Sequence, residues 1–132
     1  MHVDNIAVVK RQFEEDPLGK SAKEAGAKLD AGKPRPHLVL GSFARALLEV
    51  SKVGTFGANK YSDNGWITVP HGQERYADAE LRHYLYECAG EKIDNDSELL
   101  HRAHKAWNAL AVLELYLREQ EERDAPKGAR EK

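Results

Sequence analysis

The sequence predicts an all-α protein, a small bundle of about three main helices behind an irregular N-terminal arm. Three segments place apolar residues at the spacing of one helix face. Glycine, proline and asparagine lie between these segments and supply the turns. With 132 residues, the chain fits one domain. We therefore expect a single domain over 1–132, with the arm over 1–36, the helical core over 37–122 and a disordered tail over 123–132.

The first predicted helix follows the proline-rich end of the arm. It runs from about Ser42, the expected N-cap, to about Tyr61. Its apolar stripe consists of Phe43, Leu47, Val50 and Gly54. The stretch 62–74 contains Asp63-Asn64-Gly65 together with a proline and a further glycine, so we expect the helix to end before it.

Two more helices are expected after this turn region. The second runs from about Gln73 to Ala89 and stops at Gly90, since glycine favours the left-handed conformation that ends many helices. In the acidic loop that follows, the spacing of Asn95 and Glu98 predicts a capping box for the third helix. The apolar positions of the third helix are Leu99, Leu100, Ala103, Trp107, Leu110, Leu113 and Leu117.

The third helix also indicates self-association. Between Leu110 and Leu117 it is apolar on more than one side, which one neighbouring helix does not cover. Three helices in a chain of this length rarely enclose a large core alone. We therefore expect a homodimer or homotetramer that completes a larger bundle.

Composition excludes several classes of partner. The net charge of −2 gives no overall basic field that would recruit nucleic acid. No apolar run approaches the roughly 18 residues that a membrane span needs. The single cysteine, Cys88, rules out an internal disulfide framework and fits a reducing compartment. We expect a cytoplasmic protein without nucleic-acid or membrane partners.

Two sets of polar residues repeat at the same helical spacing of i, i+3 and i+7. The set on the second helix is Glu80, His83 and Glu87. The set on the third helix is His101, His104 and Asn108. Each set lies on one face beside an apolar stripe, so both can point into a crevice between packed helices. Carboxylates and imidazoles that face each other across a bundle form metal sites. The alternative is an ordinary solvent-exposed polar face.

Two carboxylates outside these sets are further candidate metal ligands. Glu49 lies on the first helix between Arg45 and Lys52, so an intrahelical salt bridge is the alternative interpretation. Asp94 lies in the acidic loop, which lacks the glycine and the final glutamate of a calcium-binding loop at the required offsets.

Cations and aromatic rings near the first helix are candidates for binding a nucleotide. Lys33 and Arg35 lie on a backbone stiffened by prolines, where they can hold phosphate oxygens. The Walker pattern is absent, which excludes P-loop chemistry. Further candidates for phosphate and base contacts are Lys60, Tyr61, Asn64, Trp66 and Arg82. The alternatives are solvent-facing cations and aromatic rings that fill the core.

Several short motifs together resemble one enzyme family. They are Lys28-Leu29-Asp30, Gly32-Lys33-Pro34-Arg35-Pro36, Leu48-Glu49-Val50, Phe56-Gly57-Ala58-Asn59-Lys60-Tyr61, Asn64-Gly65-Trp66, Leu81-Arg82-His83, Gly90-Glu91, Ile93-Asp94, His101 and His104-Lys105-Ala106-Trp107-Asn108. In order and spacing, over roughly residues 27 to 117, the chain resembles phage and bacterial dATP/dGTP diphosphohydrolases. These include MazZ-like enzymes related to the all-α MazG pyrophosphohydrolases. The chain departs from MazG at Glu80-Leu81-Arg82-His83, which reads E-x-x-H where MazG has E-x-x-D.

The resemblance implies hydrolysis of a nucleoside triphosphate to the monophosphate and pyrophosphate. The implied substrates are dGTP, GTP or dATP, and the implied cofactor is Mg²⁺ or Mn²⁺. If the chain is phage-encoded, the reaction would take place in the host cytoplasm. The implied catalytic residues are Glu49, Glu80, His83, Asp94 and His104. The implied metal ligands are Glu49, Glu80, His83, Glu87 and Asp94. The implied substrate-binding residues are Lys33, Arg35, Lys60, Tyr61, Asn64, Trp66, Arg82, His101 and Asn108.

Two other functions fit the same residues. A non-catalytic helical module would bind a nucleotide without turnover. A di-metal bundle of the ferritin-like kind would need a Glu-x-x-His pair on two helices, and the third helix offers His-x-x-His instead.

Overall fold

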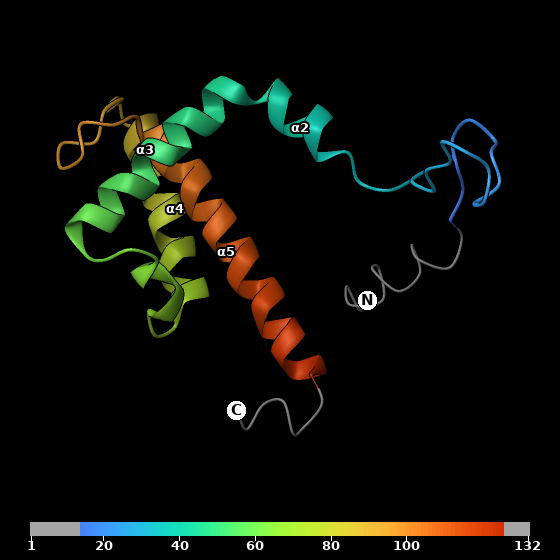
Figure 1. Ribbon diagram of the computed structural model, residues 1–132. Coiled ribbons are helices and arrows are strands. Elements are labelled where there is room, and N and C mark those ends of the chain that lie inside the picture. Colours follow the sequence, from blue (N-terminus) through green and yellow to red (C-terminus); the bar gives the residue numbers. More distant parts are fainter. Residues whose placement is uncertain (1–13, 126–132) are drawn as a thin grey trace. The chain divides into compact units, whose positions relative to one another are not determined.

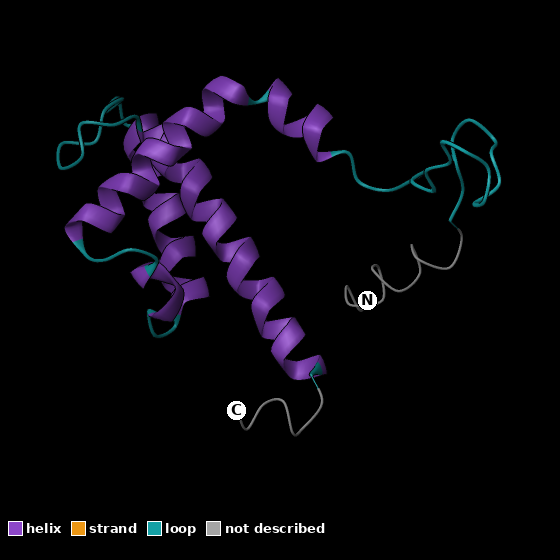
Figure 2. Cartoon of the chain, viewed as in Figure 1, coloured by secondary structure: helices purple, strands orange, loops and turns teal. Residues whose placement is uncertain are grey.

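A computed structural model of the chain describes residues 14–125 (Figure 1). The helices in this part of the chain are α2 (Pro36–Ser42), α3 (Ala44–Lys60), the 3-10 helix η1 (Gly65–Thr68), α4 (Gly72–Cys88) and α5 (His101–Asp124). Figure 2 shows helices and loops and no strand among the described residues, which confirms the all-α prediction. Most of the predicted tail and the first part of the predicted arm lie outside the described residues.

The chain divides into two compact units, with the boundary between Val39 and Leu40. In the first unit, the described residues before α2 form turns rather than helices, as predicted for the arm. The Asp16 carboxylate organises these turns by accepting the backbone N–H groups of Lys28 at 2.8 Å and Leu18 at 2.6 Å. Both bonds lower the pKa of Asp16 because they stabilise its ionised form, and the bond from Lys28 has the larger effect.

In the second unit, α5 packs against both α4 and α3 (Figure 1). Close approach depends on glycine at two points. A Cβ on Gly72 of α4 would lie 2.8 Å from Leu115 Cδ1 of α5, and one on Gly54 of α3 would lie 3.1 Å from Trp107 Nε1. A side chain at either position would require Leu115 or Trp107 to shift, so glycine permits the close approach seen here.

An aromatic cluster fixes η1 and α4 against α5. The rings of Trp66, Tyr76 and Trp107 meet pairwise edge to face, with centroids 5.5 to 6.2 Å apart. The Tyr76 hydroxyl also donates a hydrogen bond to the Trp66 carbonyl at 2.9 Å. The rings therefore supply much of the apolar contact at this end of the bundle.

Two predicted helix starts are wrong. Ser42 is the last residue of α2 and does not cap the next helix, because α3 begins at Ala44. The third predicted helix begins later than its capping box, since α5 starts at His101 with Leu100 as N-cap. Glu98 has a φ of 61°, which is incompatible with a first helical turn. Backbone hydrogen bonds across the loop, from Asp94 to Leu99 and from His101 to Lys92, hold it away from helical geometry.

The apolar core of the bundle is thin. Among residues 14–125, the buried apolar side chains are Val53, Ala103 and Ala111. Large apolar side chains on α5 stay about half exposed, including Leu110, Leu113 and Leu117. None of the helices described combines the length and the apolar character required to cross a bilayer.

The aromatic cluster generates a stability prediction. Replacing Trp107 by alanine should lower the free energy of unfolding by about 3 kcal/mol, because the ring loses contacts with two other rings and leaves a cavity. Urea denaturation followed by circular dichroism measures the change. As a control, Tyr61→Ala removes a ring that is 77% exposed and should cost less than about 0.5 kcal/mol. Equal losses in the two variants would contradict the role given to the cluster.

Candidate active site

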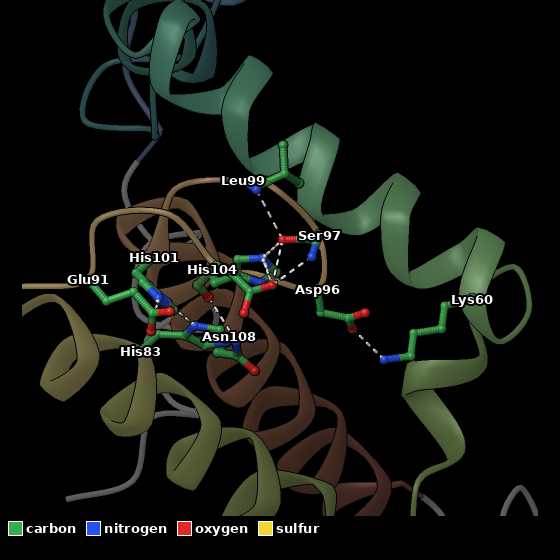
Figure 3. A network of polar contacts seen from close by, with 10 residues as sticks. Lys60, His83, Glu91, Asp96, Ser97, Leu99, His101, His104 and Asn108 are labelled. Carbon is green, nitrogen blue, oxygen red and sulfur yellow. Dashed lines mark hydrogen bonds and ion pairs between the residues drawn. The ribbon is translucent and has the colours of Figure 1, made fainter.

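Three imidazoles and one carboxylate converge where α4 meets the start of α5 (Figure 3). We call His83, His101, His104 and Asp94 the histidine cluster. His83 comes from the last turns of α4, and His101 and His104 come from the first two turns of α5. Asp94 comes from the loop between the helices, so the helix hairpin and its connection build the cluster together.

The loop is positioned by its own backbone. Gly90, with a φ of 105°, turns the chain after α4, and its N–H donates to the Glu87 carbonyl. An antiparallel bridge then joins Ile93 to Leu100. Beside it, the Asp94 N–H donates to the Leu99 carbonyl at 2.8 Å, and the His101 N–H donates to the Lys92 carbonyl at 3.1 Å. These bonds hold the acidic loop against the N-terminus of α5.

The two helices present their imidazoles to each other at short distances. His83 Nδ1 lies 2.7 Å from His101 Nδ1, and the two rings are tilted by 44°. The His83 ring also stacks on His104, with centroids 4.4 Å apart and an interplanar angle of 11°. Two Nδ1 atoms at this distance share one proton at most, so at least one offers a lone pair.

Ser97 connects the carboxylate to the third imidazole. Asp94 Oδ2 accepts the Ser97 N–H at 2.8 Å and the Ser97 hydroxyl at 2.7 Å. Because that hydroxyl has given its only proton to Asp94, it accepts from His104 Nε2 at 2.6 Å. His104 Nε2 lies 3.6 Å from Asp94 Oδ2. The amide of Asn108, itself buried, donates to the His104 carbonyl at 2.8 Å.

The surroundings keep His83 and His104 neutral and Asp94 charged. Burial, followed by the nearby His104 and His101, lowers the pKa of His83 from its ordinary 6.5 to about 4. Burial also lowers the pKa of His104, although Asp94 partly opposes the shift. For Asp94, burial alone would raise the pKa, but the hydrogen bonds from Ser97 outweigh it and the pKa is lowered. Near neutral pH, the cluster therefore offers free nitrogen lone pairs and an anionic oxygen.

Three of these groups have the spacing of a cation site. One ligand atom from each of His83, Asp94 and His101 can be chosen so that all three lie within 4.8 Å of one another. His101 is 1% exposed, and the other two side chains are half-buried. Two imidazole nitrogens and one carboxylate oxygen suit a divalent cation of borderline softness.

The other predicted metal ligands lie outside this group. Glu49 pairs with Lys52 at 2.7 Å, which is the intrahelical salt bridge given above as the alternative to a metal ligand. Glu87 pairs with Arg102 at 2.7 Å, and Glu80 is half-buried on α4. The metal roles of these three glutamates and the catalytic roles of Glu49 and Glu80 stay predictions.

The predicted substrate-binding residues are distributed over both units. Lys33, which pairs with Glu14 at 3.1 Å, and Arg35 belong to the first unit. In the second unit, Lys60 reaches Asp96 at 2.7 Å from the end of α3 (Figure 3). Tyr61, Asn64 and Arg82 are exposed, whereas Trp66 belongs to the aromatic cluster. The structure brings His101 next to the predicted ligand His83, and Asn108 bonds the carbonyl of His104.

Two polar residues at the site were missed by sequence reasoning. Ser97 lies three residues after Asp94, a spacing at which a serine can bond an aspartate in a turn, so the local pattern contained a signal. Glu91 Oε2 lies 3.1 Å from His101 Nε2. No local pattern predicted that contact, because it depends on how the loop folds back.

An all-α helix pair that gathers three imidazoles and a carboxylate at one end is an arrangement that could hold a cation. The comparison with protein families is more specific. The family model described as dATP/dGTP diphosphohydrolase, N-terminal, matches residues 23–125. The chain therefore belongs to the dATP/dGTP diphosphohydrolase family, as its motifs predicted. The match includes the whole histidine cluster. No curated protein and no solved structure matches the chain.

The lowered pKa of His83 predicts how stability depends on pH in the metal-free protein. Between pH 6.5 and about 4 the unfolded chain binds a proton at His83 that the folded chain excludes. The free energy of unfolding should therefore be highest above pH 6.5 and fall as the pH drops towards 4. Urea unfolding in chelator at pH 7, 5.5 and 4.5 measures this fall.

A variant pair isolates the contribution of His83. His83→Asn should flatten the pH dependence, whereas His37→Asn, a change on exposed α2, should leave it as in the original chain. A pH dependence that is the same in His83→Asn and in the original chain would show that the cluster is not the cause.

Proposed function

We propose that this chain is a metal-dependent nucleoside triphosphate diphosphohydrolase, which converts dGTP, GTP or dATP to the monophosphate and pyrophosphate in the cytoplasm. Two findings together, the family match and a group of candidate cation ligands within the matched residues, support this proposal most directly. The chain belongs to a family described by that chemistry. Within the matched residues, His83, Asp94 and His101 form a compact group that could hold a cation.

The donor chemistry of the histidine cluster fits the cofactor that the family implies. Asp94 is ionised and His83 is neutral near pH 7. Neither group therefore has to be deprotonated before it can bind a cation. Two nitrogen donors favour Mn²⁺ over Mg²⁺, which prefers oxygen. When bound, the ion would neutralise charge on the triphosphate and lower the pKa of a water molecule. Glu49, Glu80 and Glu87 remain proposed ligands of a further ion.

The chain's own residues would complete the site. His104 donates its Nε2 proton to Ser97, so this ring is oriented before any substrate arrives. Lys60, Arg82, Lys33 and Arg35 are the proposed cations for phosphate oxygens. Tyr61 is exposed beside Lys60 at the end of α3, which leaves its ring available to stack on a base. Asn64 and Trp66 are the proposed neighbours of that base.

The hydrolysis reaction is the first test. With Mn²⁺ and each nucleoside triphosphate in turn, we expect a monophosphate and pyrophosphate, separated by ion-exchange chromatography. His83→Ala and His101→Ala should each lower kcat/KM by about 100-fold or more, because each removes a proposed ligand worth several kcal/mol. Asp78→Asn changes an exposed carboxylate on the same helix as His83 and should keep full activity.

Two results would refute the proposal. Release of a nucleoside diphosphate with orthophosphate would place cleavage at another bond. Nucleotide binding without turnover at any Mn²⁺ concentration would identify a non-catalytic nucleotide-binding module.

We also propose that the protein is a homo-oligomer, a dimer or tetramer, that associates through α5. Its exposed side chains Leu110, Leu113 and Leu117 lie three and four residues apart, the spacing of a coiled-coil seam. Ala106 extends the same row by one turn towards the N-terminus. An identical row on a second copy can pack against it about a two-fold axis, which would add the apolar burial that the thin core lacks.

The oligomeric state tests this part of the proposal. Leu113→Glu puts a charge in the middle of the row and should convert the oligomer to a monomer, as measured by sedimentation equilibrium. Leu18→Glu places the same charge on a leucine that is 84% exposed in the first unit and should leave the mass unchanged. A monomeric original chain, or an unchanged mass for Leu113→Glu, would exclude association through α5.

A further inference from the structure

We propose that Glu91 is a positioning residue, which fixes the tautomer of His101 so that its Nδ1 offers a lone pair to a divalent cation. The inference deepens the proposed function, since it concerns how the chain prepares the same site. The juxtaposition behind it is a continuous line of contacts. Glu91 Oε2 lies 3.1 Å from His101 Nε2, and His101 Nδ1 lies 2.7 Å from His83 Nδ1 (Figure 3).

The fold places Glu91 by backbone contacts on both sides. Its N–H donates to the Tyr86 carbonyl at 2.9 Å, which ties it to the last turn of α4. The backbone carbonyl of the next residue, Lys92, accepts a hydrogen bond from the backbone N–H of His101 at 3.1 Å. Because the neighbouring backbone is bonded to His101 itself, the Glu91 carboxylate is brought to the outer edge of the imidazole, on the side opposite to His83.

The chemistry of the carboxylate determines where the His101 proton lies. An ionised carboxylate accepts hydrogen bonds and donates none. His101 must therefore keep its proton on Nε2, and its Nδ1 is left with a lone pair that faces His83. In the cation-free protein, the 2.7 Å contact is then a hydrogen bond from His83 Nδ1–H to His101 Nδ1.

Cation binding would need two changes at His83. The 2.7 Å contact between the two Nδ1 atoms would have to open, because it is too short for one ion to bind both nitrogens at bond lengths of about 2.0–2.1 Å. If His83 bound through Nδ1, its proton would move to Nε2 of the same ring. His101 already has the required tautomer and needs no change. A carboxylate behind a ligating imidazole also raises its basicity and fixes its orientation.

Burial makes the choice of tautomer strict. His101 is 1% exposed, so water cannot replace a missing partner at either nitrogen. Glu91 is half-buried and makes its contact at the edge of the site. The nearby Glu87 cannot serve in its place as it stands, because its carboxylate is paired with Arg102 at 2.7 Å.

Two measurements that need no nucleotide test the inference. Long-range ¹H–¹⁵N spectra of the cation-free protein should show His101 protonated at Nε2, with Glu91→Ala giving a mixture of tautomers. Mn²⁺ affinity, measured by calorimetry, should fall by about 10- to 100-fold in Glu91→Ala. Glu91→Gln keeps an oxygen acceptor and should lose less than about 10-fold. Glu114→Ala, which removes a carboxylate paired with Arg118 on α5, should bind Mn²⁺ like the original chain.

The outcomes separate this inference from the proposed function. A Glu91→Ala variant with its His101 tautomer and its Mn²⁺ affinity unchanged would overturn the inference even if the chain hydrolyses dGTP. A changed tautomer with weakened Mn²⁺ binding would support it even if no triphosphate is hydrolysed. Circular dichroism of each variant shows whether the helices are retained, so that a loss of folding is not mistaken for a loss of positioning.

Discussion

The paired backbone of the loop between α4 and α5 is the constraint on which the candidate site depends. The bonds from Asp94 to Leu99 and from His101 to Lys92 fold the loop onto the start of α5. Without them, Asp94 would be a solvated loop residue, and α5 could begin earlier. With them, the carboxylate lies beside two histidines that the helices already bring together. The loop thus adds an oxygen to a pair of nitrogens, and the mixed donor set follows from backbone geometry.

Burial and hydrogen bonding act in opposite directions on the members of the cluster. Taking an imidazole out of water disfavours its charged form, which keeps His83 neutral. The same burial would also neutralise Asp94, but the N–H and hydroxyl of Ser97 compensate. One small residue therefore allows a carboxylate to stay ionised beside neutral imidazoles. It does so while orienting His104, so the charge pattern and the geometry of the site share one cause.

Sequence reasoning recovered the features that depend on helical periodicity. The spacing of His101, His104 and Asn108 placed them on one face of α5, and all three are buried there. It failed where contacts between distant residues decide the outcome. The predicted capping box at Asn95 and Glu98 is absent, since bonds across the loop hold Glu98 at a φ of 61°. The contact between Glu91 and His101 was missed for the same reason. Completion of the bundle by a second copy stays a prediction from the apolar row of α5.

The distribution of buried residues explains why the polar cluster is unlike a structural core. His101, His104 and Asn108 are as buried as Val53, Ala103 and Ala111, the apolar core residues of the part described. A helix pair selected for stability alone would place leucine at such positions, because apolar burial avoids the cost of desolvating polar groups. Here the cost is met by hydrogen bonds to Glu91, Ser97 and the backbone. Buried positions that break the apolar pattern yet keep hydrogen-bond partners are expected where function sets the residue. The histidine cluster meets that description, and it lies within the residues that place this chain in its family.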